Sequence, residues 1–388
     1  MEAITEAKNG ASAERFKWYA ALGLVALSAH AFLFFKFVPR DALLFVGSWY
    51  RHILATGPID AFAHPFANYN PPYLYLLSAT TIFDGAASVA FLIKALSWLG
   101  AIWLWIAGRR LFAAIGRSQS LALLLLALPS VILNVSMLGQ ADTFWVAPCV
   151  LAVAASIKGR LVWVAIWSGL AFAFKAQAIF LAPFVLHLFV SRRAPLAAWI
   201  AAPLTFAACM VPAWLLGWPL IELGKVYLNQ ANWQPLDQPF ISNSASFWTF
   251  FSYSLAAEAW RYRWLGFLAA LAISTLFVRR SPKVAGVQLI AAAAVSSAIV
   301  PFVLPGMHER FFILADVLAA AYAIARPNLR SILAACLIQV ASAGPVLVWA
   351  FQLGRLEIFA PTLMAVGIVL LARGISSDDM QRAELRDA

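Results

Sequence analysis

LALLLLALPSVILNVSMLGQADTFWVAPCVLAVAASI, residues 121–157, contains a single charged residue, Asp142, and two apolar runs that meet at Gly139-Gln140. A helix needs about 20 apolar residues to cross a hydrocarbon core of about 30 Å. This stretch therefore predicts two membrane spans joined by a tight turn. The whole chain has the same character, since 63% of its residues are hydrophobic and only 12% are charged. No stretch resembles a separate soluble domain.

The same pattern along the rest of the chain predicts an all-α polytopic integral membrane protein, a single domain over residues 1–388, with about 12 transmembrane helices. We expect these spans at residues 18–38, 84–107, 120–138, 141–157, 161–174, 176–191, 196–216, 262–278, 285–304, 310–325, 331–350 and 358–373. The run 161–174 is short for a full crossing. No small-residue cleavage site follows the first run, which predicts a retained span rather than a signal peptide.

Basic residues gather in alternate breaks between the apolar runs. These breaks are residues 108–119, 158–160, 192–195, 279–284 and 326–330, and the positive-inside rule makes them cytoplasmic together with the tails 1–17 and 374–388. The opposite breaks are poorer in Lys and Arg and are expected outside: 39–83, 139–140, 175, 217–261, 305–309 and 351–357. The net charge of +11 is explained by these loop flanks, so we do not expect a nucleic-acid partner.

Two outer loops are long. In the loop 39–83, the apolar segment that begins at Asp41 predicts interfacial helices lying along the membrane surface. The loop 217–261 is rich in Trp, Asn, Gln and Pro. The three cysteines are far apart in apolar runs, and the histidines lack a metal-ligand spacing, so we expect neither a disulfide nor a metal site.

The remaining polar groups at membrane depth all fall on the predicted outer side. They are Asp41, Asp60, Tyr69, Asn70, Tyr73, Gln140, Asp142, Lys175, Gln177, His308, Glu309 and Arg310. Ionisable groups at membrane depth are expensive, so such a cluster indicates a functional site.

Asp41 is the first carboxylate after the first predicted span. Apolar neighbours at the membrane boundary would raise the pKa of such a carboxylate and make it a better base. The alternative is an interface ion pair with Arg40 or Arg51. Asp60 competes for the same role, although its position after Gly57-Pro58 also suits a turn residue.

The cationic residues of the cluster suit an anion. His308 and Arg310 precede a predicted helix, whose free N–H groups complete a natural phosphate site. The alternative is a surface pair between Glu309 and Arg310. Lys175 at the tip of a short hairpin is either an anion ligand or a snorkelling lysine. Asp142, in the first turn of its span, is either a helix cap or a substrate ligand.

Taken in order, these motifs resemble the GT-C class of polytopic glycosyltransferases, in particular the branch that uses polyprenyl-phosphate-linked sugars. That branch includes the glucosyltransferases of N-glycan precursor assembly and bacterial proteins similar to the mannosyltransferases of GPI-anchor assembly. The matching elements are Asp41 before Trp49, Asn70-Pro71-Pro72-Tyr73-Leu74, Gly139-Gln140-Ala141-Asp142, Lys175-Ala176-Gln177 and His308-Glu309-Arg310. Asn70 stands where the branch has Tyr, and the paired-carboxylate metal motif of other GT-C branches is absent.

The resemblance implies an inverting glucosyl- or mannosyltransferase at the periplasmic face of the bacterial inner membrane, with both termini cytoplasmic. It would move a hexose from a polyprenyl-phosphate donor to a hydroxyl of a lipid-linked or cell-envelope glycan, without a metal or cofactor. Asp41 would be the base, and Arg310, His308 and Lys175 would neutralise the leaving phosphate. The remaining substrate-binding candidates are Gln140, Asp142, Gln177, Glu309, Tyr69, Asn70 and Tyr73.

Two other classes of protein stay open. A transporter or lipid flippase also needs polar groups within the membrane, usually on broken helices in repeated halves. A glycan polymerase or ligase would instead use diphosphate-linked donors.

Overall fold

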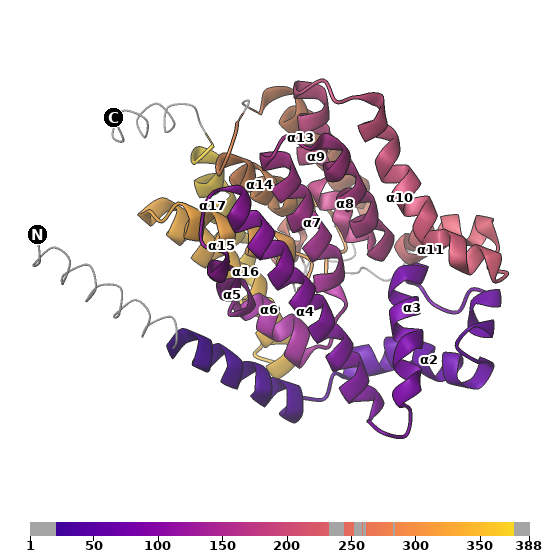
Figure 1. The fold of residues 1–388 in the computed structure, drawn as a ribbon. Helices are drawn as coiled ribbons and strands as arrows, with labels where there is room; N and C mark the ends of the chain where they lie inside the picture. The colour runs from indigo at the N-terminus through magenta and orange to yellow at the C-terminus, as the bar shows by residue number, and fades with distance from the viewer. Residues whose placement is uncertain (1–20, 233–243, 252–257, 259–260, 282–283, 376–388) are drawn as a thin grey trace, which may run out of the picture.

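A computed structural model describes residues 21–232, 244–251, 258, 261–281 and 284–375 (Figure 1). All regular elements in these ranges are helices, so the all-α prediction is confirmed. The main helices are Ala21–Lys36, α2 (Arg40–Thr56), α3 (Pro71–Thr80), α4 (Val89–Ala114), α5 (Leu123–Leu126), α6 (Pro129–Ile132), α7 (Asp142–Ile157), α8 (Leu161–Phe174), α9 (Ala182–Ser191), α10 (Leu196–Leu215), α11 (Leu220–Asn232), α13 (Arg263–Arg280), α14 (Gln288–Val303), α15 (Ile313–Ala325), α16 (Leu329–Phe351) and α17 (Ala360–Arg373).

Every apolar run expected to span the membrane coincides with a helix or a pair of helices. Four helices of the described residues are long and apolar enough to cross a membrane, or up to six if each bent pair is one span. Several others, including α8, have only 10–17 residues. The count of about 12 spans therefore stays a prediction. The tails 1–17 and 374–388 lie outside the described residues, apart from Gly374 and Ile375.

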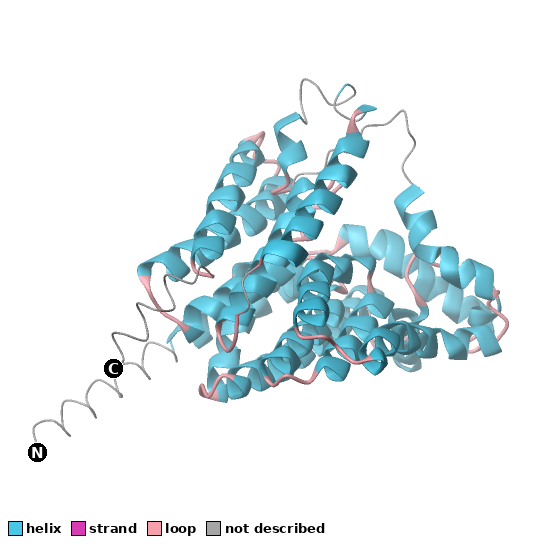
Figure 2. Cartoon of the chain, turned by 90° about the horizontal axis from the view of Figure 1, so that it is seen from above, coloured by secondary structure: helices cyan, strands magenta, loops and turns pink. Residues whose placement is uncertain are grey.

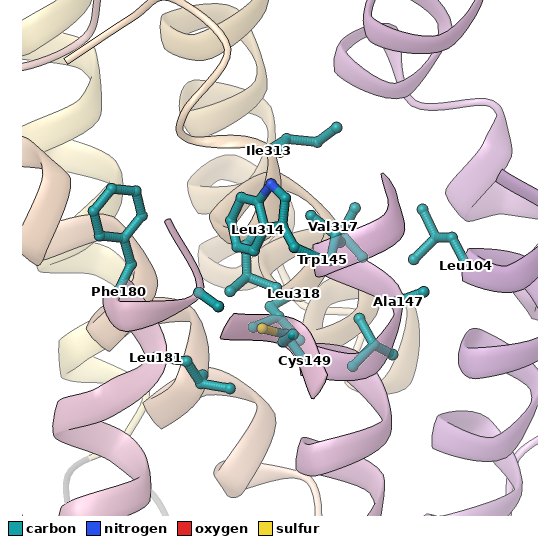
Figure 3. Packing of buried hydrophobic residues seen from close by; sticks show 14 of the residues in the cluster. Leu104, Trp145, Ala147, Cys149, Phe180, Leu181, Ile313, Leu314, Val317 and Leu318 are labelled. Atoms are coloured by element: carbon teal, nitrogen blue, oxygen red, sulfur yellow. The ribbon is translucent and has the colours of Figure 1, made fainter. Parts of the chain in front are cut away.

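The helices pack in two groups, one from the first part of the chain and one from its last part. α4 lies against α7, α7 against α8 and α8 against α10, whereas α14 to α17 form the second group (Figure 1). Figure 2 shows the same bundle from above, with helices joined by loops. Gly100 lets α4 and α7 approach closely, because a Cβ there would lie 2.3 Å from Thr143 Oγ1. Small residues at helix contacts are typical of membrane bundles. Leu104, Trp145, Phe180 and Leu314 belong to one continuous buried hydrophobic cluster, in which Trp145 and Leu314 lie between Phe180 and Leu104 (Figure 3).

Arginines of the predicted cytoplasmic breaks contact the ends of neighbouring helices. Arg117 Nη2 donates to the Ala325 carbonyl at 2.9 Å. Arg192 Nη1 donates to the Ser156 carbonyl at 2.9 Å. Arg192 Nη2 also donates to the Val284 carbonyl at 3.4 Å, so the breaks 192–195 and 279–284 are adjacent. That all the basic breaks share one side, and how the protein is oriented in a membrane, stay predictions.

The predicted outer loop 39–83 begins with a sharp bend. The helix Ala21–Lys36 and α2 meet at 63°, with Pro39 between them. Proline disfavours a helical conformation in the residue before it and has no N–H for the helix ladder. The bend leaves Asp41 in the first turn of α2. In the second long loop, residues 220–232 form α11, whereas 233–243 and 252–257 lie outside the described residues.

Candidate active site

A cavity of about 350 Å³ opens where the predicted outer breaks converge. Its walls come from α2, the loop before α3, the turn before α7, the segment after α8, α11, α13, and the loop between α14 and α15. The predicted site residues that line it are Asp41, Tyr69, Gln140, Lys175, Gln177, His308 and Arg310. Asn70, Tyr73, Asp142 and Glu309 are buried and do not line the cavity. Asp60 is exposed in another part of the loop.

Asp41 faces the cavity, and its side chain is 31% exposed. Its Oδ2 accepts a hydrogen bond from Gln140 Nε2 at 3.0 Å and lies 3.7 Å from Arg310 Nη2. Among the ion pairs of the described residues, none joins Asp41 to Arg40 or Arg51. The structure therefore favours the site interpretation of Asp41 over the interface ion pair.

Asp142 and Lys175 form a buried ion pair at the cavity wall, in which Lys175 lines the cavity and Asp142 lies behind it. Lys175 Nζ lies 2.6 Å from Asp142 Oδ1. The same oxygen accepts a hydrogen bond from Trp145 Nε1, and Oδ2 accepts one from Asn134 Nδ2 at 2.8 Å. These partners are side chains, so Asp142 does not bond the backbone N–H groups that a capping role requires. Lys175 is nearly buried rather than snorkelling to solvent.

Removing one charge of this pair should be costly. Asp142→Asn leaves the Lys175 ammonium buried without a counter-charge, which typically costs about 3–5 kcal/mol. We expect a large fall in thermal stability in detergent, and a partial recovery in the double variant Asp142→Asn/Lys175→Met. A double variant no more stable than Asp142→Asn alone would show that the two groups are not energetically coupled.

The loop between α14 and α15 carries the second ion pair. Arg310 Nη1 donates to Glu309 Oε1 at 2.8 Å, and His308 Nδ1 lies 3.7 Å from Glu309 Oε2. Burial alone would raise the pKa of the Glu309 carboxyl, but Arg310 and His308 lower that pKa to about 2. The predicted Glu309–Arg310 pair exists, yet Arg310 also lines the cavity between Asp41 and Asp142, with its Nε 3.8 Å from Asp142 Oδ2.

The three carboxylates of the site therefore differ. Asp142 and Glu309 are each bound to a cation within 2.8 Å, whereas Asp41 lies 3.7 Å from its nearest cation and is partly exposed. Asp41 is the carboxylate that lines the cavity and the one most available to take a proton.

Aromatic and amide groups complete the walls. The Tyr69 ring packs against Trp49 and Tyr73, and Lys175 Nζ lies 5.2 Å from its centroid. Gln177 is 7% exposed, and among the described residues no hydrogen-bond donor reaches its Oε1. A buried acceptor without a donor is unfavourable.

Sequence reasoning missed Asn134. It lies in a π-helical turn, Leu133–Met137, and its backbone carbonyl accepts the Gln140 N–H at 3.0 Å while its side chain binds Asp142. π-helical turns are frequent at functional sites. The available signal was an amide side chain within the apolar run 121–138.

Among the described residues, no group of three or more His, Cys, Asp or Glu side chains is arranged to hold a metal ion. A cavity lined by polar groups in a bundle of apolar helices is typical of a polytopic membrane protein.

No protein-family model and no curated protein sequence matches the chain. The fold is similar to that of ArnT from Cupriavidus metallidurans, whose crystal structure was solved bound to undecaprenyl phosphate. The two share 15% identity with a TM-score of 0.50, and the match covers 92% of this chain and 77% of that one. The similarity confirms the GT-C-like fold expected from the motifs.

Proposed function

We propose that this protein is an inverting glycosyltransferase that moves a hexose from a polyprenyl-phosphate donor to an acceptor hydroxyl at the periplasmic face of the inner membrane. The observation that carries the proposal is the cavity in which Asp41 lies beside Arg310, with Lys175 and His308 in the same walls. The shared fold with a protein that binds undecaprenyl phosphate supports a polyprenyl-linked donor.

In the proposed reaction, the oxygen of the acceptor hydroxyl attacks the anomeric carbon of the sugar, and Asp41 removes the proton from that hydroxyl. The bond from that carbon to the phosphate oxygen breaks, which inverts the configuration and releases polyprenyl phosphate. A positioned base contributes about 10²–10⁴-fold to such a rate. The Gln140 amide holds the Asp41 carboxylate by one oxygen and leaves the other available to the hydroxyl.

Negative charge grows on the leaving phosphate, and Arg310, Lys175 and His308 would stabilise it. Such contacts are most effective where water is largely excluded. Gln177 would orient a sugar hydroxyl, and Tyr69 would contact the sugar. The buried Asp142 and Glu309 would act through the cations that they bind, while Asn70 and Tyr73 would support the wall that carries Tyr69.

A donor panel tests the proposal. Purified protein is supplied with polyprenyl-monophosphate hexoses, with diphosphate-linked glycans and with acceptor glycolipids, and product linkage is measured. We expect transfer from a monophosphate donor with inversion. Transfer from diphosphate-linked glycans alone would favour a polymerase or ligase. Movement of lipid between leaflets without a new glycosidic bond would favour a flippase.

We also expect transfer without a divalent metal. Arg310, Lys175 and His308 can neutralise the phosphate in place of a metal ion. Activity should therefore survive excess EDTA at an unchanged rate. A rate that falls in EDTA and returns with Mg²⁺ or Mn²⁺ would contradict this expectation.

A further inference from the structure

Lys94 is a buried cation with no part in the proposed chemistry. It lies near the start of α4 and is 2% exposed. Its Nζ donates to three backbone carbonyls, those of Leu33 at 2.9 Å, Phe34 at 2.8 Å and Phe37 at 2.5 Å. These bonds use all three donors of the ammonium group. Among the ion pairs of the described residues, none includes Lys94, so backbone carbonyls alone compensate its burial.

The three carbonyls belong to the end of the helix Ala21–Lys36 and the residue that follows it. The last carbonyls of a helix lack partners within that helix and carry its negative dipole end. The chain itself supplies one such partner, because the Phe37 N–H donates to the Leu33 carbonyl at 3.2 Å. The helix does not continue beyond this point, since the path turns by 63° into α2 with Pro39 between the two helices. Lys94 therefore closes the end of one helix at the bend that begins the next.

The same lysine lies against the second segment that holds Asp41. Gly139 has a φ of +61°, and a Cβ there would lie 3.2 Å from Lys94 Cγ and 3.6 Å from Pro39 Cβ. The next residue, Gln140, donates to Asp41. The side chain of Lys94 is thus packed between the bend that carries Asp41 and the turn that carries the hydrogen-bond partner of Asp41.

We infer that Lys94 is a positioning residue for Asp41: it holds the bend before α2 so that the carboxylate keeps its place beside Gln140 in the cavity. This inference rests on the proposed function, since position matters only if Asp41 reacts. A base must lie within hydrogen-bond reach of its proton, and a displacement of 1 Å can cost about 10²-fold in rate.

Lys94→Met in the full-length protein tests the inference, because methionine keeps the stem length and loses all three donors. We expect faster amide hydrogen exchange in residues 37–45 and a kcat lower by about tenfold to a hundredfold. The donor KM should stay unchanged, because the phosphate-binding candidates lie on other segments. Lys94→Arg retains a cation and should recover part of both losses, and it serves as the measured variant if Lys94→Met does not fold.

Trp98→Phe is the matched control on the same helix. Trp98 Nε1 donates to Ser136 Oγ, which is also hydrogen-bonded to His30 of the helix Ala21–Lys36. This contact therefore also holds the helix Ala21–Lys36, but at a point farther from Asp41 than the contacts of Lys94. We expect wild-type exchange at residues 37–45 and wild-type kcat in this variant. Equal effects of the two variants would mean general loosening of the helix and would overturn the inference.

Wild-type amide hydrogen exchange or a wild-type kcat in Lys94→Met would also refute the positioning role of Lys94. The exchange measurement needs no donor, so it separates the two proposals. If the wild-type protein transfers no sugar while exchange still rises in Lys94→Met, the proposed function fails and the structural role of Lys94 at the bend stands.

Discussion

Asp41→Asn is expected to lower the rate of glycosyl transfer by about 10²–10⁴-fold, the contribution of a positioned base. The amide has the size of the carboxylate, and its oxygen can still accept the hydrogen bond from Gln140 Nε2. The variant therefore loses the proton acceptor while the cavity keeps its shape. Donor affinity should change little, which separates loss of the base from loss of binding. Single-turnover rates and donor affinity measured on the same preparation check both parts.

Asp60→Asn is the control, because Asp60 belongs to the same outer loop but is exposed and does not line the cavity. We expect wild-type turnover in this variant. Near-normal turnover in Asp41→Asn together with a loss in Asp60→Asn would transfer the role of base to Asp60.

Arg310→Ala is expected to weaken donor binding by about 10–100-fold, since a hydrogen bond to a charged group contributes about 1.5–3 kcal/mol. Transfer should slow further because the developing phosphate charge loses a partner. Arg310→Lys should recover only part of the affinity, because a lysine cannot reproduce the planar fork that binds Glu309 and, in the proposed reaction, would bind the donor phosphate at the same time. Donor affinity is measured by titration into detergent-solubilised protein.

The same substitution leaves the buried Glu309 carboxylate without its cation, so thermal stability must be measured beside affinity. Glu309→Gln is the matched control, because it breaks the pair and leaves the guanidinium in place. If Arg310 is purely structural, the two variants should lose stability alike and a folded Arg310→Ala protein should bind donor normally. Loss of affinity in Arg310→Ala alone supports the phosphate role.

The predicted helices followed from the sequence because apolar length and the spacing of basic residues are local signals. The run 196–216 became α10 within one residue. The run 84–107 became α4, which begins five residues later and ends seven residues later than predicted, so the first part of the predicted break 108–119 is helical. The charge pattern also predicted that the outer breaks would share one side, and Asp41, Gln140, Lys175 and Arg310 do line one cavity. A polar residue inside a membrane is costly wherever it lies, so its position within an apolar run already marks it as a candidate functional residue.

Which of these residues face the cavity depended on packing between distant segments. The sequence gives no reason for Asp142 to turn inward toward Lys175 while Asp41 stays partly exposed, since both begin helices after a polar break. The contacts of Lys94 with carbonyls about 60 positions earlier depend on a bend of 63°. Composition and periodicity thus determined the class of protein, because they depend on local residues. The pair of the adjacent residues Glu309 and Arg310 could be predicted locally. Only the tertiary structure decided the pairing of Asp142 with Lys175 and of Lys94 with its carbonyls, because these groups lie on segments that are far apart in the sequence.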